Sequence, residues 1–159
     1  MNEITKIFII GIGATIAVDL WSAFLRLFSI TSLDYRYVGR WIAYFPKGVF
    51  VHQNIMTTSS VPGELVIGWT AHYLIGTFFA FLLIVCYGIE WIETPALYPA
   101  LFIGAVSVCA PLFMMQPAFG FGIASAKLPD PNLRRMKSVL THLIYGIGLY
   151  GTALLIGLF

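Results

Sequence analysis

Four long apolar runs alternate with short polar segments along the chain. They cover approximately residues 4–30, 65–89, 97–124 and 139–159. Each is long enough to cross a hydrocarbon core of about 30 Å as an α-helix, which satisfies its own backbone polar groups where water is absent. Strands of a membrane barrel would alternate in polarity, and these runs do not. The pattern predicts an all-α membrane protein, a four-transmembrane-helix bundle that forms a single integral membrane domain over residues 1–159.

The composition supports a bilayer as the main solvent of this chain. Hydrophobic residues make up 59% of it and charged residues 10%, whereas soluble domains have about 45–50% and about 25%. The formal net charge is +2, and the basic residues fall in two connections rather than in one groove-sized patch. We therefore expect the lipid bilayer as a partner and no nucleic acid.

The distribution of Lys and Arg predicts the orientation. The first connection and its borders carry Arg26, Arg36, Arg40 and Lys47, and the third carries Lys127, Arg134, Arg135 and Lys137. The second connection has no Lys or Arg, and Lys6 argues only weakly the other way. Because short basic loops stay in the cytoplasm, we expect a multi-pass protein of the bacterial inner membrane with both termini periplasmic.

The first connection, about residues 31–64, is long for a compact bundle. Its segment 35–45 mixes aromatic and basic residues, which suits an interfacial segment in the headgroup layer. The alternative interpretation is a lid over a cytoplasmic mouth, in which Arg36, Arg40 or His52 contacts an anionic ligand.

Two spans share a short motif. The second contains Thr70-Ala71-His72 and the fourth Leu140-Thr141-His142, and each has a Gly four positions after the His. Two repeated helical hairpins would produce this similarity. Shared small-residue packing is the alternative.

Polar residues accompany small residues within the spans. Gly11, Thr15 and Asp19 follow one another at four-residue steps, as Gly68, His72 and Gly76 do. Such stripes mark faces where membrane helices approach closely. An ionisable group near the bilayer centre costs at least about 2.5–3.5 kcal/mol, so these groups should face each other or a wet cavity. The predicted ligand or proton site comprises Asp19, His72, Gln116 and His142.

Two prolines interrupt the third span. Pro111 and Pro117 each remove a backbone donor and clash with the preceding turn, which predicts a kink or a break. Broken helices often accompany transporter binding sites. We expect this segment to be a hinge.

Other chemistries have less support in the sequence. Haem ligated by His72 and His142 is physically feasible, but nothing in the sequence requires it. We find no dense metal-ligand motif, no nucleophile motif and no HExxH helix, so we expect neither a metal site nor an enzyme. Cys86 and Cys109 lie within apolar runs, where we expect buried thiols.

Several motifs resemble a family of small bacterial membrane proteins of unknown function, the DUF-2938 group. The resemblance rests on residues 11–15 with Asp19-Leu20-Trp21, on Tyr37–Trp41, Val61–Glu64 and Gly68–Tyr73, and on Ala110-Pro111 through Met115-Gln116-Pro117. It covers nearly the whole chain. It implies a multi-span membrane architecture and no catalytic residues.

The sequence therefore leads to a functional hypothesis with an alternative. We interpret the chain as a small permease or ligand-binding protein with a polar intramembrane site, which forms a homodimer or higher homo-oligomer through its glycine-rich fourth span. The alternative is a haem- or quinone-binding membrane subunit, or a structural partner of a larger complex. A Soret band in the purified protein would favour haem.

Overall fold

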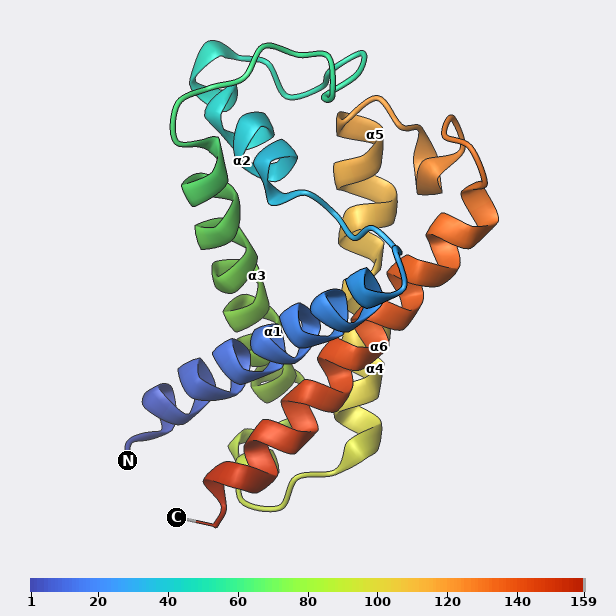
Figure 1. The fold of residues 1–159 in the computed structure, drawn as a ribbon. Coiled ribbons are helices and arrows are strands. Elements are labelled where there is room, and N and C mark those ends of the chain that lie inside the picture. The colour runs from blue at the N-terminus through green and yellow to red at the C-terminus, as the bar shows by residue number, and fades with distance from the viewer. Residues whose placement is uncertain (159) are drawn as a thin grey trace. The chain divides into compact units, whose positions relative to one another are not determined.

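The computed structural model describes residues 1–158, and over these residues all regular structure is helical (Figure 1). The α-helices are α1 (Glu3–Leu27), α2 (Tyr35–Ala43), α3 (Glu64–Tyr87), α4 (Leu97–Ser107), α5 (Gln116–Ala118) and α6 (Pro131–Ile156). Shorter helical turns are η1 (Phe45–Lys47), η2 (Ile89–Ile92), η3 (Pro111–Met115) and η4 (Ile123–Ser125). The prediction of an all-helical protein is confirmed.

Four helical stretches are long and apolar enough to cross a membrane. They are Glu3–Leu27, Glu64–Tyr87, Leu97–Ala118 and Pro131–Ile156. Each overlaps one of the four predicted spans, and the fold is consistent with a four-helix bundle. The segment 35–45 of the first connection contains the helix α2.

Two boundaries differ from the prediction. The third span ends at Ala118 rather than near residue 124, because Gly120 turns the chain with a φ of 85° while its N–H donates to the Pro117 carbonyl. The last helix begins at Pro131, eight residues before the apolar run, since proline suits the first helical position. Arg134, Arg135 and Lys137 therefore lie within α6. The apolar pattern marked the part of the helix that suits a membrane, not its whole length.

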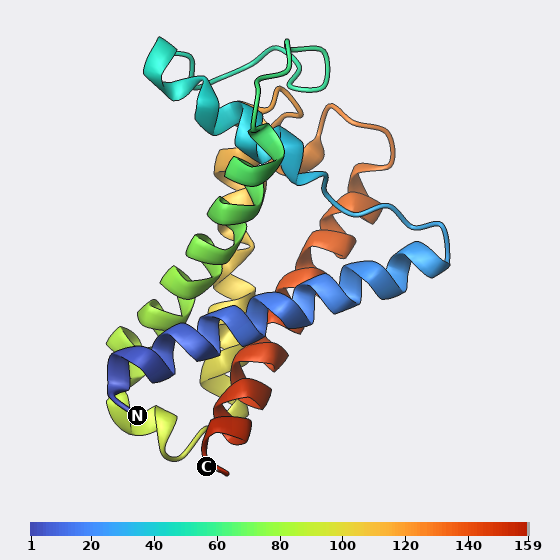
Figure 2. The ribbon, with the colours of Figure 1, turned by 60° about the vertical axis from the view of Figure 1, so that its left-hand side comes forward.

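The chain forms two compact units, which we describe separately. Unit 1 comprises Met1–Ser32, Tyr73–Ser107 and Val139–Phe159, and unit 2 comprises Leu33–His72 and Val108–Ser138. Unit 1 thus contains α1 and α4 with most of α3 and α6. In both views the start of α1 and the end of α6 lie at the same end of unit 1 (Figures 1 and 2).

In unit 1, small residues bring α1 into backbone contact with α3 and α6, and α1 crosses α6 obliquely (Figure 2). A Cβ atom added to Gly11 would lie 2.6 Å from the Thr77 Cα atom, and one added to Gly148 would lie 2.8 Å from the Ala14 Cα atom. Gly76 meets the side chain of Thr15 in the same way. This is how membrane helices associate when lipid is as apolar as their side chains.

The helices α4 and α6 also touch through glycines. A Cβ atom at Gly104 would lie 2.5 Å from the carbonyl oxygen of His142, and one at Gly146 would lie 2.7 Å from that of Ala100. The buried Tyr145 hydroxyl of α6 donates a hydrogen bond to the Gly76 carbonyl of α3 at 2.5 Å. The glycines that follow the two motif histidines, Gly76 and Gly146, thus each face the preceding span of their hairpin.

Unit 2 is organised by the packing of α2 on the first turns of α3 (Figure 2). Gly39 on α2 lies against the Glu64 carbonyl, and Gly68 on α3 lies against the Tyr35 carbonyl. The loop between the two helices, residues 44–63, also attaches to the end of the third span. The His52 N–H donates to the Ala118 carbonyl at 2.8 Å, and the Ile55 N–H donates to the Phe119 carbonyl at 3.0 Å. Ile55 and Phe119 are both fully buried.

The third span departs from α-geometry where its prolines predict a disturbance. Residues Pro111–Met115 form a π-helical turn, and the Gln116 N–H donates to the Pro111 carbonyl. Since Pro111 and Pro117 have no N–H, the regular bonding pattern cannot continue through either position. The predicted hinge movement stays a prediction.

The two cysteines differ from expectation. Cys86 and Cys109 are exposed on their helices instead of buried. Both lie on apolar spans, so an exposed position there faces a surface suited to lipid, where a small apolar side chain is equally acceptable.

Two glycines of α6 provide a matched test of backbone packing. Gly146→Ala should destabilise the protein by roughly 1–3 kcal/mol, because the new methyl group meets the backbone of Ala100 and Leu101. Gly151→Ala should be neutral or stabilising by up to about 1 kcal/mol, since Gly151 has open space beside it and alanine favours a helix. Thermal unfolding in detergent measures both changes. Equal midpoints for the two variants would contradict this packing.

Candidate functional site

Asp19 lies in the interior of the first span and is hydrogen bonded to the second. The Tyr73 hydroxyl of α3 donates to the Asp19 carboxylate at 2.7 Å, and both side chains are partly buried. The contact follows from the α1–α3 packing, because Gly11, Thr15 and Asp19 lie on one face of α1. A carboxylate at this position needs such a donor, since lipid provides none.

His142 has a similar connection between the third and fourth spans. Its Nδ1 atom lies 2.7 Å from the hydroxyl of Ser107, which also donates to the Gly104 carbonyl at 2.7 Å. Because a hydroxyl has a single proton, Nδ1 acts as the donor to Ser107 when both bonds form. The exposed surface of Ser107 is 1%, so this contact belongs to the interior of unit 1.

Both pairs lie in unit 1, near its close contacts between helices. Asp19 comes four positions after Thr15 on α1, while Tyr73 and His142 come three positions before Gly76 and Tyr145 on α3 and α6. Each of these polar residues is thus about one helical turn from a residue at which two helices pack closely. We call Asp19, Tyr73, Ser107 and His142 the polar pairs of unit 1.

The other two predicted site residues belong to unit 2. The Tyr35 hydroxyl lies 3.0 Å from His72 Nε2, and the two rings stack with centroids 4.2 Å apart. The buried Gln116 accepts a hydrogen bond from the Ser125 hydroxyl at 2.9 Å through its side-chain oxygen. The structure thus gives each predicted residue a polar contact within its own unit. A common site for all four residues stays a prediction.

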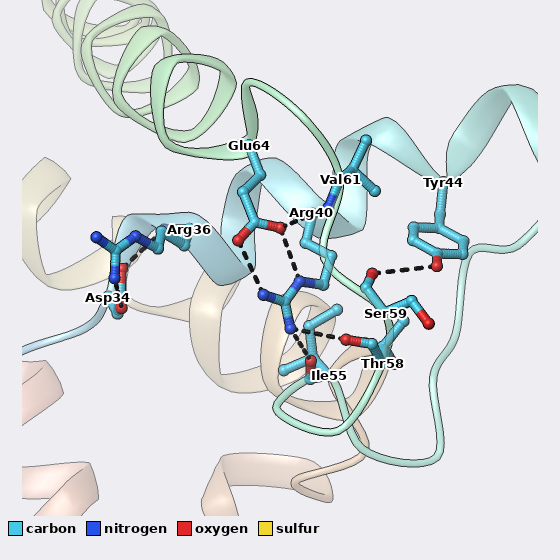
Figure 3. Close-up of polar contacts among 9 residues, drawn as sticks. All are labelled: Asp34, Arg36, Arg40, Tyr44, Ile55, Thr58, Ser59, Val61 and Glu64. Atoms are coloured by element: carbon cyan, nitrogen blue, oxygen red, sulfur yellow. Dashed lines mark hydrogen bonds and ion pairs between the residues drawn. The ribbon is translucent and has the colours of Figure 1, made fainter.

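Arg40 forms the most extensive polar network of unit 2 (Figure 3). Its Nε and Nη2 atoms donate to the two carboxylate oxygens of Glu64, both at 2.8 Å. Its Nη1 atom donates to the carbonyls of Ile55 and Thr58, both at 2.9 Å. Glu64 also accepts from the Val61 N–H at 3.0 Å. The hydrogen-bonded Glu64 carboxylate raises the pKa of the Arg40 guanidinium.

This network gives Arg40 a different role from the expected contact with an anionic ligand. Arg40 and Glu64 are 8% and 9% exposed. The Nε, Nη1 and Nη2 atoms of Arg40 all donate to acceptors of the protein itself. A bidentate arginine is well suited to join two helices and two loop carbonyls at once. Arg40 therefore anchors the 44–63 loop to α2 and α3. Arg36 is exposed instead, and lies 3.7 Å from Asp34 (Figure 3).

His52, the third residue predicted at the mouth, is buried within the 44–63 loop. Its Nδ1 atom lies 3.2 Å from the Thr58 hydroxyl, and its Nε2 atom is buried without a hydrogen-bond partner. Burial lowers the pKa of His52, and the nearby positive charge of Arg40 lowers it further. Both effects favour the neutral ring.

Three contributing residues were missed by the sequence reasoning. Glu64 carried a signal, because a lone acid at the start of an apolar run needs a partner. Tyr73 and Ser107 carried none, since hydroxyl groups are common in spans and their partners lie 54 and 35 residues away.

No group of three His, Cys, Asp or Glu side chains within residues 1–158 is arranged to hold a metal ion. If His72 ligated haem iron through its Nε2 atom, that atom would have to leave its hydrogen bond with the Tyr35 hydroxyl.

An open apolar groove lies between α1 and α6 in unit 1. Its lining includes Gly13, Leu20, Gly151 and Leu155. In the glycine-rich fourth span, where we expect a subunit contact, Gly148 packs on α1 and Gly151 faces open space. The homodimer stays a prediction.

Removing the Arg40 side chain should release the 44–63 loop. Arg40→Gln leaves the Glu64 carboxylate buried without its counter-ion, at a cost of roughly 3 kcal/mol. Hydrogen exchange at the amides of His52 and Ile55 should then accelerate by about two orders of magnitude. Arg36→Gln, the same change at an exposed position of α2, should leave this exchange unaltered. The same exchange rate in both variants would rule out the anchoring role.

Acid should weaken the loop through His52. Because the folded-state pKa of His52 lies below its ordinary value of 6.5, the unfolded loop takes up a proton more readily. The free energy of opening should therefore decrease as the pH falls below about 6.5, and level off below the folded-state pKa. Hydrogen exchange at the Ile55 amide, corrected for the intrinsic rate, measures the free energy of opening. The measurement runs from about pH 7.5 to about pH 5.5, the range in which histidine side chains usually change charge. His52→Asn should remove most of the dependence; an unchanged slope would assign it to other groups.

A comparison with known proteins finds one family model, described as "Protein of unknown function (DUF2938)", which matches residues 8–156. The match reaches from α1 to the end of α6. No curated protein and no solved structure matches the chain. Because the matched region includes nearly all of the sequence, the chain belongs to the DUF2938 family of proteins of unknown function.

Proposed function

We propose that this protein is a small permease or ligand-binding protein whose polar site lies inside the membrane and binds a proton together with its ligand. Asp19 is the proton-accepting member of the site, and His142 is the other ionisable member in unit 1. His72 and Gln116, which belong to unit 2, stay members predicted from the sequence alone. The observation that carries the proposal is the hydrogen bond from Tyr73 to Asp19.

Burying a carboxylate inside a span costs free energy, and a contact with a purely structural role can be made without one. Of the acidic residues, Glu3 and Glu64 stand at the first residue of their helices, whereas Asp19 is eight residues from the end of α1. A Tyr–Asn or Tyr–Ser pair would join α1 to α3 without the free-energy cost of a carboxylate. A titratable group at this depth is therefore best explained by proton binding or by the binding of a polar ligand.

Two local features support the proposal. The π-helical turn Pro111–Met115 interrupts one span, and such turns occur often at functional sites. The 44–63 loop is attached by the Arg40–Glu64 network and two backbone hydrogen bonds. In this proposal the loop is the lid at the cytoplasmic mouth, with Arg36 exposed for ligand entry.

The proposed orientation follows from the basic connections. Arg36, Arg40 and Lys47 precede the second span, and Lys127 with the first turns of α6 precedes the fourth. We place both regions in the cytoplasm of a bacterial cell, with the termini periplasmic. In whole cells, Arg135→Cys should not react with a membrane-impermeant thiol reagent. Ready labelling of this cysteine would show the opposite orientation.

Asp19→Asn separates a proton-linked role from a structural one. The asparagine side-chain oxygen can still accept the Tyr73 hydrogen bond, so folding and insertion should persist while proton binding is lost. The assay uses liposomes that contain the protein and a pH-sensitive dye, with an inward proton driving force. Amino acids, organic acids, sugars and monovalent cations are added in turn.

The wild-type protein should acidify the vesicles faster in the presence of at least one of these solutes, and Asp19→Asn should reduce that rate by at least about tenfold. Tyr73→Phe keeps the carboxylate and should retain transport with a shifted pH dependence. Wild-type rates equal to those of Asp19→Asn for every solute would refute the proposal.

A further inference from the structure

The 44–63 loop carries an exposed apolar tip outside the four spans. Val49, Phe50 and Val51 are consecutive and are 36%, 57% and 69% exposed. They follow Gly48, which turns the chain with a φ of 71°. We call residues 47–51 the loop tip. Three adjacent exposed apolar side chains on an ordered turn are unfavourable in water and indicate a contact surface.

The loop tip is held in shape by aromatic residues. The indole N–H of Trp41 donates to the Phe50 carbonyl at 2.7 Å. The Phe45 ring lies 5.0 Å from the Trp41 ring and 5.2 Å from the Phe50 ring, between centroids. The apolar side chains are thus presented from a fixed platform on α2 and η1. Tryptophan and other aromatic residues are enriched where membrane meets water.

The position of the loop tip relative to the second span follows from contacts within unit 2. Arg40 on α2 binds Glu64, the first residue of that span, and Tyr35 binds His72, about 12 Å further along α3. The helix α2 therefore leads from the level of His72 past the start of the span. The 24 residues of α3 extend about 36 Å, slightly more than the hydrocarbon thickness. Since the loop tip follows α2, we place it at the headgroup level.

The loop tip carries one basic residue, Lys47, and belongs to a unit with a net positive charge. Lys47 is exposed, and its ammonium lies 4.7 Å from the centre of the Tyr44 ring. Unit 2 contains seven of the nine Lys and Arg residues of the chain but only three acidic residues, Asp34, Glu64 and Asp130. Of these acids, Glu64 is already paired with Arg40. A negatively charged surface complements this unit.

We propose that the loop tip docks on the acidic phospholipid surface of the bilayer that holds the protein. Val49, Phe50 and Val51 insert among the upper ends of the acyl chains, while the Lys47 ammonium contacts lipid phosphate. Lysine can bury its stem and keep its charge at the headgroups. This interaction surface is independent of the proposed transport function.

Spin labels test the depth of the loop tip directly. In a background with Cys86→Ala and Cys109→Ala, a label at Val51→Cys is compared with one at Thr57→Cys, an exposed position on the same loop. The protein is reconstituted into phosphatidylcholine vesicles with and without about one-third phosphatidylglycerol. Collision with oxygen, which partitions into lipid, is measured against collision with a water-soluble nickel chelate.

The label at position 51 should be oxygen-accessible and nickel-shielded, more so with phosphatidylglycerol, while the label at position 57 meets nickel in both vesicles. The added shielding of position 51 from nickel in phosphatidylglycerol vesicles should be about fivefold smaller in the Lys47→Gln variant. Equal nickel access at positions 51 and 57 would overturn the proposal. The proposal would also be overturned if the label at position 51 were shielded from both reagents and its spectrum showed dipolar broadening. That result would identify a protein partner instead of lipid.

Discussion

A polar side chain inside a bilayer has to find its partner within the protein, and this constraint explains most of the interior contacts. Tyr73 meets Asp19, and Ser107 meets His142, because no water is available to either pair. Such contacts between different spans require backbones that approach closely. Glycine and other small residues allow that approach, so the polar pairs of unit 1 depend on its close packing.

Unit 2 meets the same constraint by a different means. Here Arg40 and Glu64 form a bidentate ion pair that also satisfies two loop carbonyls and one backbone N–H. The cost of burying the two charges is offset because each has several short hydrogen bonds. The pair fixes the 44–63 loop, which in turn orders His52 and the aromatic platform beneath Phe50. The ion pair thus acts together with the backbone hydrogen bonds of His52 and Ile55 in fixing a long connection.

The two histidine motifs illustrate how similar sequences acquire different surroundings. Gly76 and Gly146 both pack against the preceding span of their hairpin. His142 bonds to Ser107 of that span, whereas His72 bonds to Tyr35 of α2. The long first connection contributes α2, which carries the partner of His72. The two histidines thus have different partners, while the glycines that follow them pack in a similar way.

Apolar runs and the placement of glycine and proline determined the spans, the break in the third span and the faces on which helices meet. These features are local, since each depends on residues within a few turns of one helix. The sequence also identified Asp19 and both spanning histidines as residues that need polar partners. It did not identify Tyr73, Ser107 or the role of Arg40, because those partners are 24 or more residues away along the chain. Which hydroxyl or carboxylate completes each pair depends on the rotation and crossing of the helices, and only the tertiary structure decided these.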